Sequence, residues 1–257
     1  MKKSVLATLC ILVGIMLVAS MAYAAGGIKT TAHDLSTKGK GNWAGDSVEQ
    51  SGLGLDRICI YCHAPHNTKQ GTDLQGVKYY PLWNHTVTKA TYLMYGNGAE
   101  VPNDQSHQSQ AAAELIGKNQ PGSVSRLCLS CHDGTIATNA YGATDSASKG
   151  AGDVLITAAL NPKQFLIGGD NGAGVNDLSN HHPIGFNYAN VAAKDDEIAK
   201  TTASMGTGGL KIADLLWQGN MECTTCHDVH NTKNTGEKFL WISDAQSNLC
   251  LTCHLKG

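Results

Sequence analysis

The strongest hydrophobic segment of the chain lies at its start. An apolar run covers residues 5–18, Lys2 and Lys3 precede it, and the sequence Ala-Tyr-Ala follows it at residues 22–24. This order of basic, apolar and small residues is typical of a secretory signal peptide, and the apolar run is short for a membrane span. We therefore predict that residues 1–24 are a signal peptide and that no membrane span remains after cleavage.

The rest of the chain has few segments with regular periodicity. Apolar residues at helical spacing predict a helix over residues 209–217, and a polar, alanine-rich stretch that stops at Gly117 predicts a surface helix. Ser243 and Gln246 form a capping-box pattern, which predicts a helix through the last cysteines of the chain. Short apolar runs predict three strands, at residues 153–158, 163–168 and 238–242.

The composition is poor in residues that fill a protein core. Only three of the 257 residues are Phe, whereas 29 are Gly. Removal of the predicted signal peptide leaves 17 basic and 21 acidic side chains, a net charge of −4, with arginine only at Arg57 and Arg126. This balance does not favour a nucleic-acid partner, which would require concentrated basic side chains. Either the fold is loose or a group other than protein fills its centre.

Eight of the nine cysteines lie in four copies of one short motif. The copies are CIYCH (59–63), CLSCH (128–132), CTTCH (223–227) and CLTCH (250–254), and the ninth cysteine belongs to the predicted signal peptide. C-x-x-C-H attaches c-type haem: the thiols bond to the two porphyrin vinyl groups and the histidine becomes the proximal iron ligand. We predict four covalent haem c groups, held by Cys59, Cys62, Cys128, Cys131, Cys223, Cys226, Cys250 and Cys253.

Other uses of paired cysteines account for the pattern less well. A disulfide scaffold would not place every cysteine in such short loops, and a thioredoxin-like site needs only one pair. A zinc ribbon could use the last two pairs but does not explain the histidines. With 11 histidines in 257 residues, chance would place one after each pair in about one case in 23, so four in a row are not accidental.

Four haems would replace the missing protein core. They are large and mostly apolar, and glycine lets the backbone approach them closely. We therefore predict a mostly irregular chain with short helices and a few short strands around covalently bound haems. Residues 25–257 would form a single tetrahaem domain, with one haem pair in residues 25 to about 145 and another from about 180 to 257.

The sixth iron ligand decides between an electron carrier and an enzyme. A haem with two histidine ligands passes electrons, whereas an open iron can bind and reduce small molecules. The predicted proximal ligands are His63, His132, His227 and His254, which leaves seven further histidines. Histidine is favoured over methionine for the sixth position, since only Met94, Met205 and Met221 remain after cleavage.

Five of the further histidines are the distal candidates. His66 and His230 each follow a proximal histidine by three residues, so each lies on the wrong side for its own haem and is free to ligate a neighbour. We predict that His66 serves the second haem and His230 the fourth. The first and third haems would draw on His33, His85 and His182, with His181 as a competitor, whereas His107 lies in a polar stretch and is expected to be solvated.

Two weaker features have ordinary explanations beside functional ones. Asp170, Asn171 and Asp177 resemble a glycine-aspartate calcium loop, but a single copy is more often a turn. Arg57 and Arg126 each stand two residues before a motif, where they could bind haem propionates or simply be solvated.

The series HDLS, CIYCHAPHN, PLWNHT, CLSCHDG, HHPIGF, CTTCHDVHN and CLTCH resembles the paired-CXXCH multihaem cytochromes. It is similar in particular to the secreted tetrahaem cytochromes that polymerise into extracellular nanowires in metal-reducing bacteria. The resemblance implies bis-histidine ligation of every haem, a continuous haem chain, and one axial histidine donated by the adjoining subunit of a homopolymer. His33, near the mature N-terminus, is the residue expected to be donated.

The sequence therefore predicts an electron-transfer protein rather than an enzyme. It would be secreted to the cell surface or beyond and would exchange electrons with other redox proteins or extracellular acceptors. Two alternatives stay open at this point. One is a monomeric periplasmic shuttle, and the other is a multihaem reductase of a small oxyanion, which would need an open iron among basic groups.

Overall fold

The computed structural model describes ten segments of the chain, residues 27–29, 31–36, 57–65, 82–96, 109–142, 155–156, 166–168, 176–206, 209–233 and 238–255. The predicted signal peptide, His66, His107, Asp170 and Asn171 lie outside these segments. Within the described residues, no helix is both long enough and apolar enough to cross a bilayer.

The described chain is mostly irregular, with short helices and two pairs of very short strands, as the sequence predicts. Its longest helix, α3, has 10 residues. The helical elements are η2 (Ile58–Tyr61), α2 (Gln110–Leu115), α3 (Ser123–His132), α5 (Tyr188–Ala192), α6 (Ile212–Leu215), α7 (Cys223–Cys226), η5 (Ala245–Ser247) and α8 (Asn248–Cys253). The antiparallel strand pairs are β1 (Phe186–Asn187) with β4 (Asn220–Met221), and β2 (Ser204–Met205) with β3 (Leu210–Lys211).

The predicted surface helix exists as α2. It begins after Ser109, whose side chain accepts a hydrogen bond from the Ala112 N–H, and the chain turns away at Gly117, where φ is +75°. One face of α2 is buried through Ala112 and Leu115 while Ala113 is exposed, so the helix lies at the surface of the protein as predicted.

The predicted helix over 209–217 is wrong in extent. Leu210 and Lys211 pair as strand β3, and only Ile212–Leu215 are helical. The Asp214 carboxylate accepts a hydrogen bond from the Lys211 N–H at 2.8 Å, which fixes the start of the helix, and Leu216 has returned to extended backbone. Local hydrogen bonding therefore limits this apolar segment to one turn.

The predicted helix through the last cysteines exists as α8, but its predicted capping box is wrong, and the predicted strands are not found where their residues are described. Ser243 accepts from the Ala245 N–H instead, and α8 begins only after Ser247, which has left-handed backbone with φ of 60°. None of the described residues of the three predicted strands belongs to a strand. Residues 238–242 instead bond to a motif loop: Leu240 forms a bridge with His227, and the Trp241 N–H donates to the Cys226 carbonyl.

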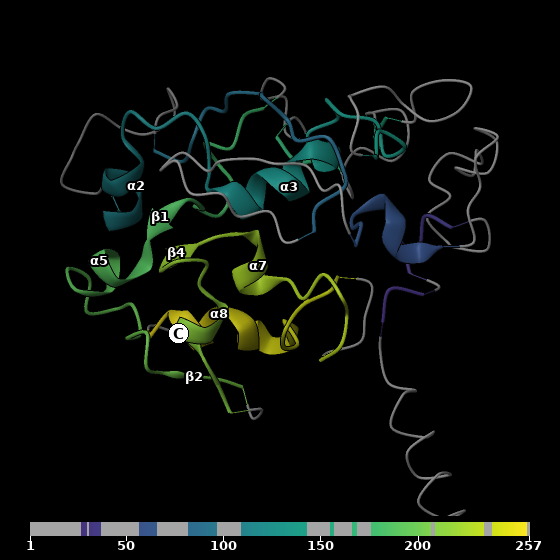
Figure 1. Cartoon of the computed structure of the whole chain (residues 1–257). Helices are drawn as coiled ribbons and strands as arrows, with labels where there is room; N and C mark the ends of the chain where they lie inside the picture. Colours follow the sequence, from purple (N-terminus) through teal and green to yellow (C-terminus); the bar gives the residue numbers. More distant parts are fainter. Residues whose placement is uncertain are drawn as a thin grey trace, which may run out of the picture.

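One cluster of buried apolar side chains joins most of these elements. It draws residues from α2, α3, α5, α6, β1 and β4, and it contains Tyr92, Met94, Ala111, Leu115, Leu129, Leu178, Phe186, Tyr188, Val191, Ala199, Ile212 and Met221. The helices α3, α7 and α8, which carry the second, third and fourth motifs, lie one above another in Figure 1. The apolar cluster includes Leu129 of α3 and packs against Cys253 of α8, so it contacts two of the motif helices.

Replacement of Gly96 by Ala tests how closely the backbone at Gly96 packs against α2. Gly96 has φ of +81°, and a Cβ there would lie 2.6 Å from the Ala112 Cβ. Gly117 has φ of +75° with no atom within 4 Å of a Cβ, so Gly117→Ala is the matched control. Gly117→Ala should cost about 1 kcal/mol from backbone strain, and Gly96→Ala a further ~1–3 kcal/mol from overpacking, measured by urea unfolding. Equal losses in the two variants would contradict the close contact.

Candidate functional site

Each described motif closes one helical turn. The His63, His227 and His254 N–H groups donate to the carbonyls of the first cysteine of their motifs at 2.8, 3.0 and 2.9 Å, and His132 ends helix α3. This turn places the first cysteine and the histidine on one side of the backbone, with the second cysteine beside them. The five-residue motif can therefore offer two thiols and one imidazole to the same ligand.

The eight motif cysteines are free thiols rather than disulfides. No three side chains of His, Cys, Asp or Glu converge as a metal site among the described residues, whereas a zinc ribbon would bring four thiolates together. Burial is the main cause that raises the pKa of Cys62 to about 11 and that of Cys226 to about 12. These cysteines are accordingly protonated thiols at neutral pH, and their surroundings do not favour thiolate ligands.

Thiols of successive motifs lie close to one another. The Cys131 thiol is near enough to Cys62 for that neighbour's charge to raise the Cys131 pKa, after the larger effect of burial. The thiols of Cys128 and Cys223 are in hydrogen-bonding contact. The charge of Cys253 raises the pKa of Cys226 in the same way, again after burial. These contacts link the first motif to the second, the second to the third, and the third to the fourth.

Three of the proximal histidines face a second histidine from a distant part of the chain. The ring centroids are 6.0 Å apart in the pair His33–His132, 6.1 Å in His63–His230 and 6.3 Å in His182–His254. The planes of the rings meet at 62°, 26° and 79° in the same order. The sequence suggested His230 for the fourth motif, but in the structure its ring lies beside His63 of the first.

These separations suit two imidazoles on opposite sides of one iron. A ring nitrogen binds a metal at about 2 Å and lies roughly 1 Å from its ring centroid, so two axial imidazoles have centroids roughly 6 Å apart. All three pairs meet this distance within a few tenths of an ångström. The residues present therefore fit c-type haem, which would take one ring of each pair from its motif and the other from elsewhere in the chain.

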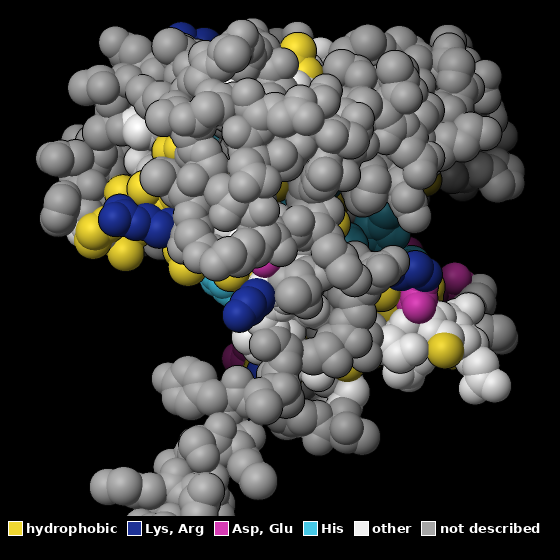
Figure 2. Space-filling model, turned by 90° about the vertical axis from the view of Figure 1, so that its right-hand side faces the viewer, with side chains coloured by type: hydrophobic (Ala, Val, Ile, Leu, Met, Phe, Trp, Pro, Cys, Tyr) yellow, Lys and Arg dark blue, Asp and Glu magenta, His cyan; other side chains and the backbone are white. Residues whose placement is uncertain are grey.

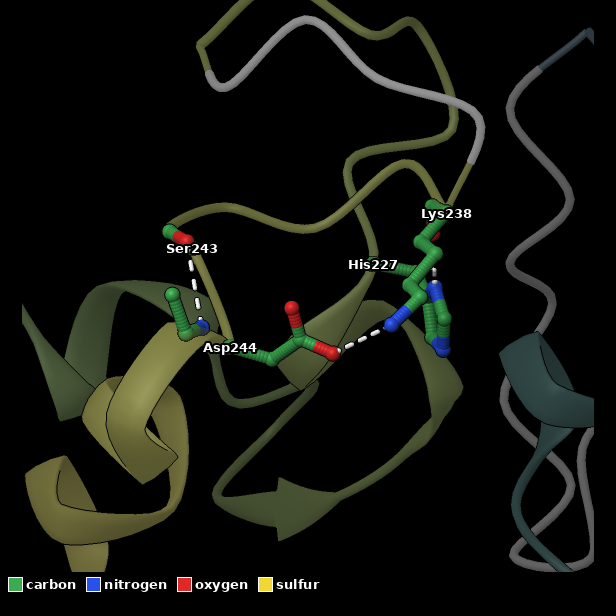
Figure 3. A network of polar contacts seen from close by, with 5 residues as sticks. His227, Lys238, Ser243 and Asp244 are labelled. Atoms are coloured by element: carbon green, nitrogen blue, oxygen red, sulfur yellow. Dashed lines mark hydrogen bonds and ion pairs between the residues drawn. The ribbon is translucent and has the colours of Figure 1, made fainter.

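Backbone carbonyls orient two of these imidazoles. His227 Nδ1 lies 2.8 Å from the Lys238 carbonyl oxygen, and Figure 3 shows this contact beside the ion pair between Lys238 and Asp244. His182 Nδ1 lies 3.1 Å from the Pro183 carbonyl oxygen. A carbonyl at Nδ1 fixes the proton there and leaves Nε2 free for a metal. Both rings therefore have the tautomer that an iron ligand requires.

His33 lies in the most protected of the three pairs. Its ring stacks on Phe239 with centroids 4.7 Å apart and planes 10° apart. Burial first, and then the charges of His132 and His227, lower the pKa of His33 to about 4. His33 is consequently neutral at physiological pH, which is the form that can ligate iron.

His85 is placed differently from the other distal candidates. It is only 2 % exposed, and its Nδ1 and Nε2 lie 2.9 and 3.0 Å from the carbonyl oxygens of Thr86 and Ala137. Both ring nitrogens are thus occupied by the backbone in this structure, although Nε2 also lies 3.8 Å from the Cys131 thiol. Histidine side chains also reach the surface in the view of Figure 2.

Two further polar side chains that the sequence singled out are Arg126 and Asp177. Arg126 donates through Nη2 to the Thr88 carbonyl at 2.9 Å, while its buried Nε has no hydrogen-bond partner. An unpaired guanidinium nitrogen beside a haem-attachment motif suits the carboxylate of a propionate. Asp177 accepts a hydrogen bond from the Ser179 N–H at 2.8 Å, which is the ordinary turn that the sequence favoured over a calcium loop.

The residue after two of the proximal histidines is a buried aspartate, a feature that the sequence analysis did not single out. Asp133 accepts hydrogen bonds from Thr88, Tyr92 and Thr135 side chains. Asp228 accepts from the N–H groups of His230, Thr232 and Lys233. The repeated sequence Cys-His-Asp in the second and third motifs was the available signal, and it marks where the chain turns after the ligand.

A family model described as the doubled CXXCH motif matches residues 218–257 of the chain. These residues contain the third and fourth motifs. Comparison with curated proteins found no match. The match and the geometry together support a multihaem c-type cytochrome with covalently bound haem c, and electron transfer is the role of that class at this level.

Asp228→Asn should destabilise the loop that carries His230. Burial raises the pKa of Asp228, but the hydrogen bonds from Thr232, His230 and Lys233 outweigh it, and the pKa lies below its usual 3.8. The pKa of Asp228 is lower in the folded protein than in the unfolded chain. The carboxylate therefore stabilises the fold fully at pH values above its pKa in the unfolded chain, and this stabilisation is lost as pH falls through its pKa in the folded protein. We expect a loss of about 2 kcal/mol near neutral pH that shrinks in acid, measured by denaturant unfolding.

Asp244→Asn is the control for this change. The pKa of Asp244 is also lowered, first by the hydrogen bond from Lys238, but the ion pair is exposed to solvent. Exposed ion pairs add little to stability, so this variant should unfold like the wild type. An equal loss of unfolding free energy in both variants would show that the removal of a negative charge, rather than the hydrogen bonds of the buried loop, is responsible.

Proposed function

We propose that the chain is a secreted tetrahaem c-type cytochrome that carries electrons and has no substrate chemistry of its own. The three histidine pairs at 6.0–6.3 Å carry this proposal, because they would fill both axial positions of three irons. The bound haems would supply reversible one-electron chemistry. The protein would attach them through the motif cysteines and close their axial positions to other ligands.

The motif contacts support an electron path in the order of the sequence. Cys62 lies near Cys131, Cys128 contacts Cys223, and Cys226 lies near Cys253. Haems attached through these thiols would be neighbours in the order first, second, third and fourth. The first and fourth haems would then be the terminal sites for exchange with partners.

His182→Ala tests the assignment of the fourth haem. Removal of this ring should open one iron, so that one of the four haems becomes high-spin and binds cyanide, as measured by absorption and electron paramagnetic resonance of the ferric holoprotein. His181→Ala changes the adjacent histidine and should leave all haems low-spin. An unchanged spin state in His182→Ala, or the same high-spin fraction in both variants, would contradict the assignment.

The wild-type spectrum in the same experiment separates the carrier from a reductase. A reductase of nitrite or a similar oxyanion needs an open iron, which would give a high-spin signal that changes on addition of nitrite. A fully low-spin ferric protein supports the carrier.

The second axial ligand of the third haem motivates a proposal about assembly. Among the described residues, no second imidazole lies beside His227 at the centroid distance found in the other three pairs, although His33 lies close enough to sense the charge of His227. We propose that the protein forms a conducting extracellular homopolymer in which a histidine of an adjoining subunit completes one haem. His33 is paired with His132 of its own chain, so it is a weaker candidate for donation than the sequence suggested.

Electron microscopy of the protein released from its own cells tests the homopolymer. We expect filaments with a continuous haem chain across subunits and, at His227, a ligand from a second subunit. Small discrete particles would instead support a diffusing periplasmic shuttle. In that case every haem would draw both axial ligands from one chain.

A further inference from the structure

A buried carboxyl group lies between the second and third motifs and has no part in haem attachment. Glu222 immediately precedes Cys223, and only 1 % of its surface is exposed. Its Oε2 accepts a hydrogen bond from Ser125 of α3, whereas its Oε1 is buried and has no hydrogen-bond partner of good geometry. An unpaired buried carboxylate oxygen is costly, so its retention calls for a reason.

The surroundings are built to hold this carboxyl group. A Cβ on Gly122 would lie 1.8 Å from Glu222 Oε1, so only glycine leaves room for that oxygen. Ser125 also accepts a hydrogen bond from the Cys223 N–H at 3.0 Å, and the Glu222 N–H donates to Thr225 at 3.0 Å. The carboxyl group is therefore fixed where α3 meets α7, beside the contact between Cys128 and Cys223.

Few charged groups act on Glu222 from the elements around it. Burial is the main cause that raises its pKa to about 8, and the Cys223 thiol acts in the same direction. The Ser125 hydroxyl, the Gly122 backbone and the charge of Lys118 oppose the rise. Haem attachment would convert Cys223 and Cys128 into neutral thioethers, but burial would remain. The carboxyl group can therefore change its protonation near neutral or alkaline pH.

We propose that Glu222 binds a proton when the haems attached at the second and third motifs are reduced. An external reductant supplies one electron to the iron, solvent supplies one proton to the carboxylate, and the two charges compensate each other. The electron raises the affinity of a nearby buried carboxylate for a proton, because charges interact strongly away from water. This inference rests on the proposed haem sites and adds a proton-coupling residue to them.

The pH dependence of the haem midpoint potentials tests this coupling. In the wild type, at least one potential should fall as pH rises between the pKa values of Glu222 in the oxidised and reduced proteins. A tenfold change in proton concentration can shift it by up to about 59 mV. Glu222→Gln mimics the protonated carboxyl, so it should keep the low-pH potential of the wild type at every pH. The exposed Glu197→Gln is the control and should keep the wild-type profile.

Two further measurements keep the test decisive if Glu222→Gln folds poorly. Ser125→Ala removes a hydrogen bond that favours the anion, so it should move the pH-dependent range to higher pH. Reduced-minus-oxidised infrared spectra of the wild type should show the band of a newly protonated carboxyl group. Potentials that do not depend on pH, or the same dependence in Glu222→Gln, would overturn the proposal. The haem count and low-spin spectrum of each variant report on the haem sites separately.

Discussion

The structure depends on one local constraint, the helical turn that joins two thiols and an imidazole within five residues. In the first, third and fourth motifs, the N–H of the histidine returns to the carbonyl of the first cysteine, and at His227 and His254 the backbone then becomes extended. A chain that repeats such turns cannot build long helices, because each ligand must be followed by a change of direction. The short elements and the turns at Asp133 and Asp228 are consequences of this requirement.

Pairs of histidines from remote segments connect these local turns into one unit. His230, just after the third motif, lies beside His63 of the first, and His33 lies beside His132 of the second. The N-terminal and C-terminal motifs are therefore interleaved rather than separate. Such contacts join residues that are far apart in the sequence. Closing the intervening loops costs conformational entropy, which the free energy of binding a haem would offset.

Sequence reasoning identified the motif residues because their spacing suits two covalent bonds and one coordinate bond within a single turn. It could also name His33, His182 and His230 as distal candidates, but not their partners, since pairing depends on contacts across the whole chain. It failed for the helix around Ile212 and for the strand around Leu240. There, the Asp214 side chain and the bonds between residues 239–241 and the third motif override local apolar periodicity.

Several ionisable side chains are buried around the second and third motifs, among them Asp133, Asp228 and Glu222. The interface of α3 with α7 holds the buried Glu222, and Arg126 of α3 has an unpaired Nε. Water cannot screen charges at such a site as it does at the exposed pair of Lys238 and Asp244. If haems are attached at the second and third motifs as proposed, their potentials should depend on these buried groups more than on the net charge of the protein. In the proposed carrier, the differences in potential between its haems would then be set at its centre, away from the surfaces that its partners contact.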